Sequence, residues 1–137
     1  MASLILPSVD RFVHFSSDKD YVTVIKKIKK LGKEKTLEVW EPHENKLARY
    51  TGISTNELLT QVYGEDWKKS ELLLFVCADG YKAPIPTSFF ESELSLLAYK
   101  KVGAPFTVNN LAQNQKNIKL GPYYLVWNNK NNAQIKL

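Results

Sequence analysis

The side chain with the widest chemical range in this sequence is Cys77, its single cysteine. Cys77 ends the apolar run Leu72–Cys77, and Asp79, Gly80 and Tyr81 follow it closely. A thiolate is a nucleophile and a soft metal ligand, whereas a buried thiol packs as a small apolar side chain. An Asp-Gly pair is typical of a turn, although Asp79 could also supply an acid to a pocket that Tyr81 lines. A single cysteine excludes an internal disulfide and a zinc site built from several cysteines.

The two histidines, His14 and His43, do not form a recognisable metal or catalytic motif. They lack the i, i+4 spacing that places two imidazoles on one helix face. We therefore expect each to lie at the surface or to pack, with His43 the better candidate for a metal or proton role. The sequence also lacks a glycine-rich phosphate loop and a Ser-His-Asp signature.

The net charge of +5 comes from 19 basic and 14 acidic residues, and only Arg11 and Arg49 are arginines. Specific readers of phosphate or guanine depend on arginine, so we expect no nucleic-acid partner. Four lysines, Lys26, Lys27, Lys29 and Lys30, cluster in one short segment. The favoured interpretation is a solvated helix face; a patch for nucleic acid or an anionic membrane is the alternative.

The length of 137 residues predicts a single domain over residues 1–137, which could be a piece of a longer chain. No apolar run approaches the ~18 residues of a membrane-spanning helix, so we expect no transmembrane segment. The first residues lack the basic and apolar regions of a signal peptide. We expect a periplasmic or secreted location if a leader was trimmed, and a cytoplasmic one otherwise.

The clearest local prediction is a strand–turn–strand–helix unit. Thr36–Trp40 and Leu47–Gly52 are predicted strands, joined by a turn over Glu41–Lys46. Ser54 and Glu57 have the spacing of a capping box, in which each side chain caps a backbone amide. The helix that follows is expected to end at Gly64.

The remaining segments are assigned by hydrophobic pattern and turn residues. Predicted extended segments are Leu4–Leu6, closed by Pro7, Arg11–Phe15, Leu72–Cys77, Lys82–Pro86, Leu94–Tyr99, Gly121–Trp127 and residues 133–137. Predicted helices are Asp18–Gly32, where a strand start at Val22–Val24 is the alternative, and Ser88–Glu91. A loop is expected over Asn109–Asn117. Together these elements predict an α+β fold, a mixed β-sheet with two or three helices.

The ordered series of motifs resembles the oxidoreductase molybdopterin-binding domain, the sulfite-oxidase-type fold. In that family a buried strand ends in a cysteine, followed by a short turn, an aromatic residue and a proline-ended extended segment, as in Cys77–Pro86. Glu41–Ile53, Glu57–Leu59 and Gly121–Trp127 are similar to other segments of the family. The resemblance covers residues 36–137 and implies a cofactor-binding role for Cys77, Asp79 and Tyr81. It also implies that Cys77 is the molybdenum ligand of the catalytic branch.

The sequence departs from that catalytic branch after Cys77, because no arginine or histidine follows it. A cofactor that carries phosphate needs such donors. Short members of the family, some beside cytochrome c segments, lack the cofactor-binding set. We therefore expect an accessory or degenerate domain of a periplasmic redox system, without cofactor or catalytic residue, that binds a partner such as a cytochrome c. The alternatives are a molybdopterin-dependent oxidoreductase with Cys77 as metal ligand, and a small-ligand or protein-binding domain with fold resemblance only.

Overall fold

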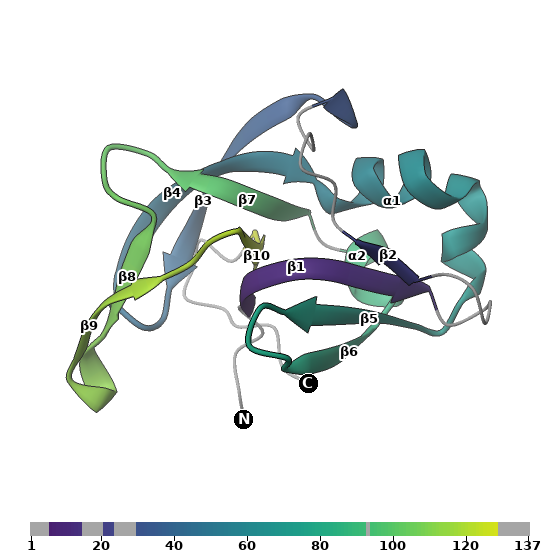
Figure 1. Cartoon of the computed structure of the whole chain (residues 1–137). Helices are drawn as coiled ribbons and strands as arrows, with labels where there is room; N and C mark the ends of the chain where they lie inside the picture. The colour runs from purple at the N-terminus through teal and green to yellow at the C-terminus, as the bar shows by residue number, and fades with distance from the viewer. Residues whose placement is uncertain (1–5, 15–20, 24–29, 93, 129–137) are drawn as a thin grey trace.

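The computed structural model of the chain describes residues 6–14, 21–23, 30–92 and 94–128. Its main feature is a sheet with the strand order β3-β4-β7-β10-β1-β5-β6, in which β2 also pairs with β1 (Figure 1). The strands are β1 (Leu6–His14), β2 (Tyr21–Thr23), β3 (Glu34–Glu41), β4 (Lys46–Ser54), β5 (Leu72–Cys77), β6 (Lys82–Pro86), β7 (Ser95–Lys101) and β10 (Tyr123–Trp127).

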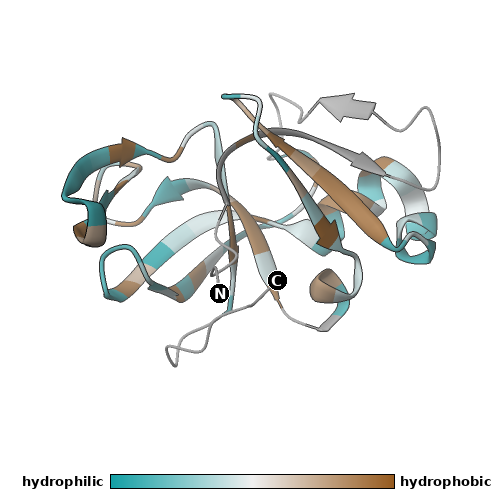
Figure 2. Cartoon of the chain, turned by 90° about the horizontal axis from the view of Figure 1, so that it is seen from below, coloured by the Kyte–Doolittle hydropathy of each residue, from teal (hydrophilic) through white to brown (hydrophobic). Residues whose placement is uncertain are grey.

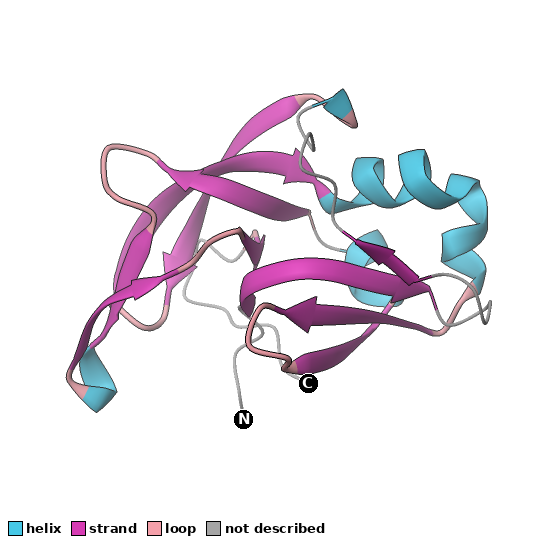
Figure 3. Cartoon of the chain, viewed as in Figure 1, coloured by secondary structure: helices cyan, strands magenta, loops and turns pink. Residues whose placement is uncertain are grey.

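Helices and a separate two-stranded hairpin complete the architecture (Figure 3). The α-helices are α1 (Thr55–Tyr63) and α2 (Ser88–Ser92), and 3-10 helices span Gly64–Lys69 and Leu111–Gln113. The strands β8 (Thr107–Asn110) and β9 (Gln115–Lys119) pair only with each other. We call the segment Thr107–Lys119 the arm. None of the helices in the described ranges has the length and apolar character needed to cross a membrane.

The α+β fold class is confirmed, but the prediction of a mixed sheet is wrong. Every strand pairing in the described part of the chain is antiparallel. Tight turns join β3 to β4 and β5 to β6, and a tight turn can connect only antiparallel neighbours. β1 runs antiparallel to both β10 and β5, between which it lies.

The central strands of the sheet are buried on both faces, which explains their continuous apolar sequences (Figure 2). Leu97 and Trp127 belong to the core beneath α1 and α2, where Phe90 of α2 lies 5.4 Å from the Trp127 ring. The alternate residues Leu96 and Val126 belong to a second core, against which the arm packs with Val108. The arm and the helices therefore cover opposite faces of the same strands.

Glycine allows the closest approach between β4 and β7. A Cβ atom at Gly52 would lie 2.2 Å from the carbonyl oxygen of Leu97 and 2.6 Å from Cα of Ala98. The register of the two strands shifts at the same place, between Thr51 and Gly52. Only a residue without a side chain fits this position.

Most of the predicted segments are confirmed, β5 with its predicted bounds. α1 ends before Gly64, whose φ of 72° is the left-handed conformation that glycine adopts readily. The predicted capping box is wrong, because Ser54 makes no side-chain cap hydrogen bond. Ser54 instead completes β4, and its pairing with Leu96 of β7 fixes the chain direction at the helix start.

Three other predictions near the chain ends need correction or fall outside the described residues. β1 is one strand that continues through Pro7 to His14, where two short strands were expected. Tyr21–Thr23 is a strand that pairs with β1, so the helix expected here is wrong and the alternative of a strand start at Val22 is confirmed. Residues 18–20 and 24–29 of the predicted helix, which include Lys26, Lys27 and Lys29, and the predicted strand 133–137 lie outside the described residues. The last residues of the predicted helix, 31–32, form a bend and not a helix. Lys30 is exposed.

The predicted loop over Asn109–Asn117 is wrong, because this segment forms most of the arm. Its asparagines supply the conformations that a tight connection needs. Asn114 and Asn117 have φ values of 53° and 55° in the left-handed region, which asparagine tolerates better than most residues. The side chain of Asn110 accepts a hydrogen bond from Gln113 N. The Asn-rich composition therefore encodes the turns of a hairpin.

Candidate functional site

Cys77 lies at the end of β5, inside the core that the helices cover. It is 6% exposed and belongs to the same buried cluster as Val9, Phe75 and Ala83. Its backbone amide donates to the carbonyl of Tyr81 across the following turn, at 2.8 Å. The structure thus places the thiol among apolar side chains.

Asp79 and Tyr81 lie on the exposed turn beyond Cys77. Gly80 has a φ of 92°, and the Asp79 carboxylate accepts a hydrogen bond from the Tyr81 amide at 2.9 Å. This is the turn chemistry expected of an Asp-Gly pair. The Tyr81 side chain is 59% exposed, whereas Cys77 is enclosed. The structure therefore does not bring the three predicted site residues together around one cavity.

Tyr81 instead borders a shallow apolar groove between β6 and α2. The groove is lined by Leu72, Tyr81, Ala83, Pro84, Pro86 and Phe89. Cys77 N donates to Tyr81 O, so the backbone groups of Tyr81 face β5. The direction of the backbone groups alternates along a strand, so those of Pro84 and Pro86 face the outer edge of the sheet. Proline has no N–H, so this edge lacks donors where an added strand would need them. A partner at this groove would have to bind through side chains.

The surroundings of Cys77 do not fit a molybdenum cofactor as the structure stands. A ligand thiol must face an open cavity, whereas Cys77 lies within a packed cluster. A phosphate group needs cationic or amide donors, and the turn beyond Cys77 presents both the carboxylate of Asp79 and the exposed Lys82 that follows it. Over the described ranges, no group of three or more His, Cys, Asp and Glu side chains could hold a metal ion.

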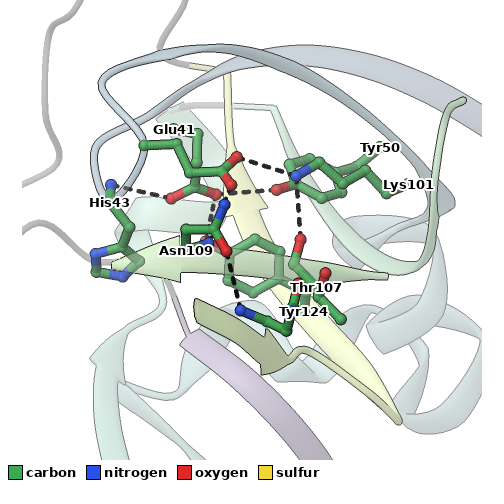
Figure 4. A network of polar contacts seen from close by, with 9 residues as sticks. Glu41, His43, Tyr50, Lys101, Thr107, Asn109 and Tyr124 are labelled. Atoms are coloured by element: carbon green, nitrogen blue, oxygen red, sulfur yellow. Dashed lines mark hydrogen bonds and ion pairs between the residues drawn. The ribbon is translucent and has the colours of Figure 1, made fainter. Parts of the chain in front are cut away.

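The most extensive polar cluster among the described residues lies elsewhere, where the β3–β4 turn meets the arm (Figure 4). Glu41 is fully buried, and its Oε2 accepts hydrogen bonds from the hydroxyls of Tyr50 at 3.0 Å and Tyr124 at 2.7 Å. Its Oε1 accepts from the backbone amide of His43 at 3.2 Å. The two tyrosine rings meet edge to face at 5.2 Å. One carboxylate therefore joins β3, β4 and β10 from within the core.

A second carboxylate in the same turn holds the arm. Glu44 forms an ion pair with Lys101 at 3.0 Å and accepts a hydrogen bond from Asn109 N at 3.0 Å. Lys101 also donates to the carbonyl of Thr107 at 3.1 Å. At the arm's other end, Leu111 N donates to the carbonyl of His43. These contacts fix the arm to the turn and to β7.

The pKa values of this cluster follow from burial and from the opposite charges. Burial raises the pKa of both Tyr50 and Tyr124, and the carboxylate of Glu41 raises it further. Burial also acts to raise the pKa of Glu44, but the hydrogen bonds from Asn109 N and Lys101 and the charge of Lys101 outweigh it and lower the pKa. The phenols are therefore hydrogen-bond donors at neutral pH, and the groups of the cluster satisfy one another. This arrangement is structural, because it holds the turn, the strands and the arm together.

The imidazole of His43 does not take part in this cluster. His43 takes part through its backbone, and its imidazole points away from the carboxylates in Figure 4. The side chain of His14 lies outside the described residues. Sequence reasoning missed Glu41, although a signal was present: Leu37 and Val39 alternate with polar residues on β3, and Glu41 continues their buried face.

No protein-family model and no curated protein matches the chain.

Proposed function

We propose that this chain is a non-catalytic accessory domain, folded like the sulfite-oxidase-type domain, that binds a protein partner in a periplasmic redox assembly and uses Cys77 as a packing thiol. The observation that carries the proposal is the enclosure of Cys77, 6% exposed, while Asp79 and Tyr81 face outward. A metal site at this position would need the thiol and its neighbours to face one cavity.

The surface beyond the turn supports a binding role. Tyr81, at 59% exposed, and Leu72, at 38%, are large apolar side chains that line the groove beside α2. Exposed aromatic residues are enriched where proteins bind one another. The prolines of β6 block strand addition at this edge, so the groove suits side-chain recognition of a partner such as a cytochrome c.

The alternative function is a molybdopterin-dependent oxidoreductase with Cys77 as the molybdenum ligand. The observation that favours it is the position of Cys77, at the end of an interior strand and directly before a turn, as the resemblance requires. This alternative requires the cluster around Cys77 to open. A binding domain with fold resemblance only is the remaining possibility.

Two measurements on the full chain separate these functions. The protein is purified from a host that makes the molybdenum cofactor, its molybdenum content is measured by mass spectrometry, and Cys77 is labelled with a small thiol reagent before and after denaturation. The accessory domain is expected to hold no molybdenum and to label only when unfolded. Stoichiometric molybdenum that is lost in a Cys77→Ser variant would overturn the proposal.

A further inference from the structure

Acidic residues are unevenly distributed along this chain. All of the 14 Asp and Glu residues precede residue 94, whereas six lysines follow it. The segment that contains β7, the arm and β10 therefore has no carboxylate side chain. Such asymmetry is typical of a surface that meets a negatively charged partner.

The fold increases this asymmetry at the arm. Two carboxylates of the adjoining turn are withdrawn from the surface: Glu41 is fully buried, and the Glu44 side chain is 7% exposed. Lys116 and Lys119 on the arm are exposed, as is Lys46 at the end of the adjoining turn. The internal carboxylates hold the arm in place, and the lysines outside remain available to a partner.

The tip of the arm adds an apolar contact. Leu111, in the short helix between β8 and β9, is 63% exposed, the largest exposed fraction among the large apolar side chains described. Figure 2 shows hydrophilic residues along most of the arm. A single apolar side chain surrounded by amides and lysines has the composition of an interface anchor with a polar rim.

We infer that the arm is a docking element for a protein with an acidic surface, into which Leu111 inserts while Lys46, Lys116 and Lys119 meet carboxylates. This inference rests on the proposed partner-binding function and names the chemistry of the partner. A nucleic acid fits less well, because binding to single strands uses stacked aromatic side chains. Phe106, which directly precedes the arm in the chain, is half-buried against the second core.

The arm's attachment makes it a rigid element. Glu44 contacts Asn109, Lys101 contacts Thr107, and His43 contacts Leu111, so β8 and the tip are held before any partner binds, and β9 is held through its pairing with β8. A pre-organised surface loses little conformational entropy on binding. Charged rims of this kind mainly increase the association rate and confer salt dependence.

The test uses the full chain, labelled with ¹⁵N, and a short synthetic peptide in which Glu and Asp flank a central Phe. We expect the peptide to shift the amide resonances of Thr107–Lys119. A triple variant Lys46→Gln, Lys116→Gln and Lys119→Gln should bind the peptide about ten-fold more weakly. The control triple, Lys33→Gln, Lys69→Gln and Lys82→Gln, removes the same charge from exposed sites elsewhere and should change binding by less than about two-fold. Leu111→Ser should weaken binding several-fold at unchanged charge.

Several outcomes would overturn the inference. Equal weakening by the two triples, with no effect of Leu111→Ser, would mean that net charge alone attracts the peptide. Tighter binding of a single-stranded oligonucleotide or of phosphatidylglycerol vesicles through the same lysines would assign the arm to those partners. Peptide shifts confined to the Tyr81 groove would leave the accessory function standing and remove the arm from it. Molybdenum bound through Cys77 would refute the accessory function without touching the peptide result.

Discussion

Glu44 and Lys101 form an ion pair of 3.0 Å between the β3–β4 turn and the end of β7, and their side chains are only 7% and 10% exposed. The pair is separated by 57 residues in the chain, so it forms only when the sheet is assembled. It also lies at the base of the arm, since Glu44 contacts Asn109 and Lys101 contacts Thr107.

Replacing Glu44 with Gln should leave the Lys101 ammonium buried without its counter-charge. We expect Glu44→Gln to lower the free energy of unfolding by about 2–4 kcal/mol, measured by urea denaturation. The control is Glu65→Gln, which breaks the ion pair between Glu65, whose side chain is 70% exposed, and Lys68, whose side chain is 44% exposed. That change should have little effect on the free energy of unfolding, because solvent screens an exposed pair. Equal effects of the two changes would contradict a special role for the buried pair.

The same carboxylate should make stability depend on pH in the acid range. The pKa of Glu44 is lower in the folded protein than its ordinary value of 4.5, so the unfolded chain binds the proton more readily. Its contribution is therefore fully present above pH 4.5 and is lost as the pH falls through the lower folded pKa. We expect the unfolding free energy of the parent protein to fall more steeply below pH 4.5 than that of Glu44→Gln. Parallel curves for the two proteins would refute this prediction.

The elements that sequence reasoning located well are those whose pattern is local. β3, β4 and β5 are recognisable from alternation or from a continuous apolar run, because burial on one or both faces of a sheet imposes those patterns. The capping-box prediction is wrong because the start of the helix depends on a contact that is not local. Strand pairing between Ser54 and Leu96 decides how α1 begins, and this tertiary contact leaves no trace in the spacing of Ser54 and Glu57.

The arm and the polar cluster could not be located from local pattern. Polar segments rich in asparagine are usually loops, and this hairpin depends on tertiary contacts such as the packing of Val108 against the second core. Glu41 is a charged residue at a buried position, which sequence alone predicts poorly, because its burial depends on hydroxyls from Tyr50 and Tyr124. Of the candidate site, the sequence predicted the strand and turn around Cys77 correctly. It could not show that the thiol points into the core.

A buried hydroxyl at the start of α1 provides a third prediction. Thr55 is fully buried, and its Oγ1 has no hydrogen-bond partner in the described part of the chain. Thr55→Val keeps the shape and removes an unsatisfied polar atom, so it should raise the free energy of unfolding by about 1 kcal/mol. The matched control is Thr87→Val, because Thr87 is also buried but donates to the carbonyl of Ser70. That variant should lose about 1–2 kcal/mol, and loss in both variants would show that Thr55 has a partner after all.

The last prediction concerns the packing of Cys77. Because the thiol lies in an apolar cluster beside Phe75, Cys77→Ala should lower the free energy of unfolding by about 1 kcal/mol through the small cavity that it leaves. Cys77→Asp should lower it by several kcal/mol more, because a carboxylate at this position would be buried among the apolar side chains of the cluster. Urea denaturation of both variants gives the two values. If the position instead faces an open cofactor pocket, water can reach the carboxylate, and Cys77→Asp would be tolerated about as well as Cys77→Ala. The difference between the two variants therefore measures whether Cys77 supports the core or lines a pocket.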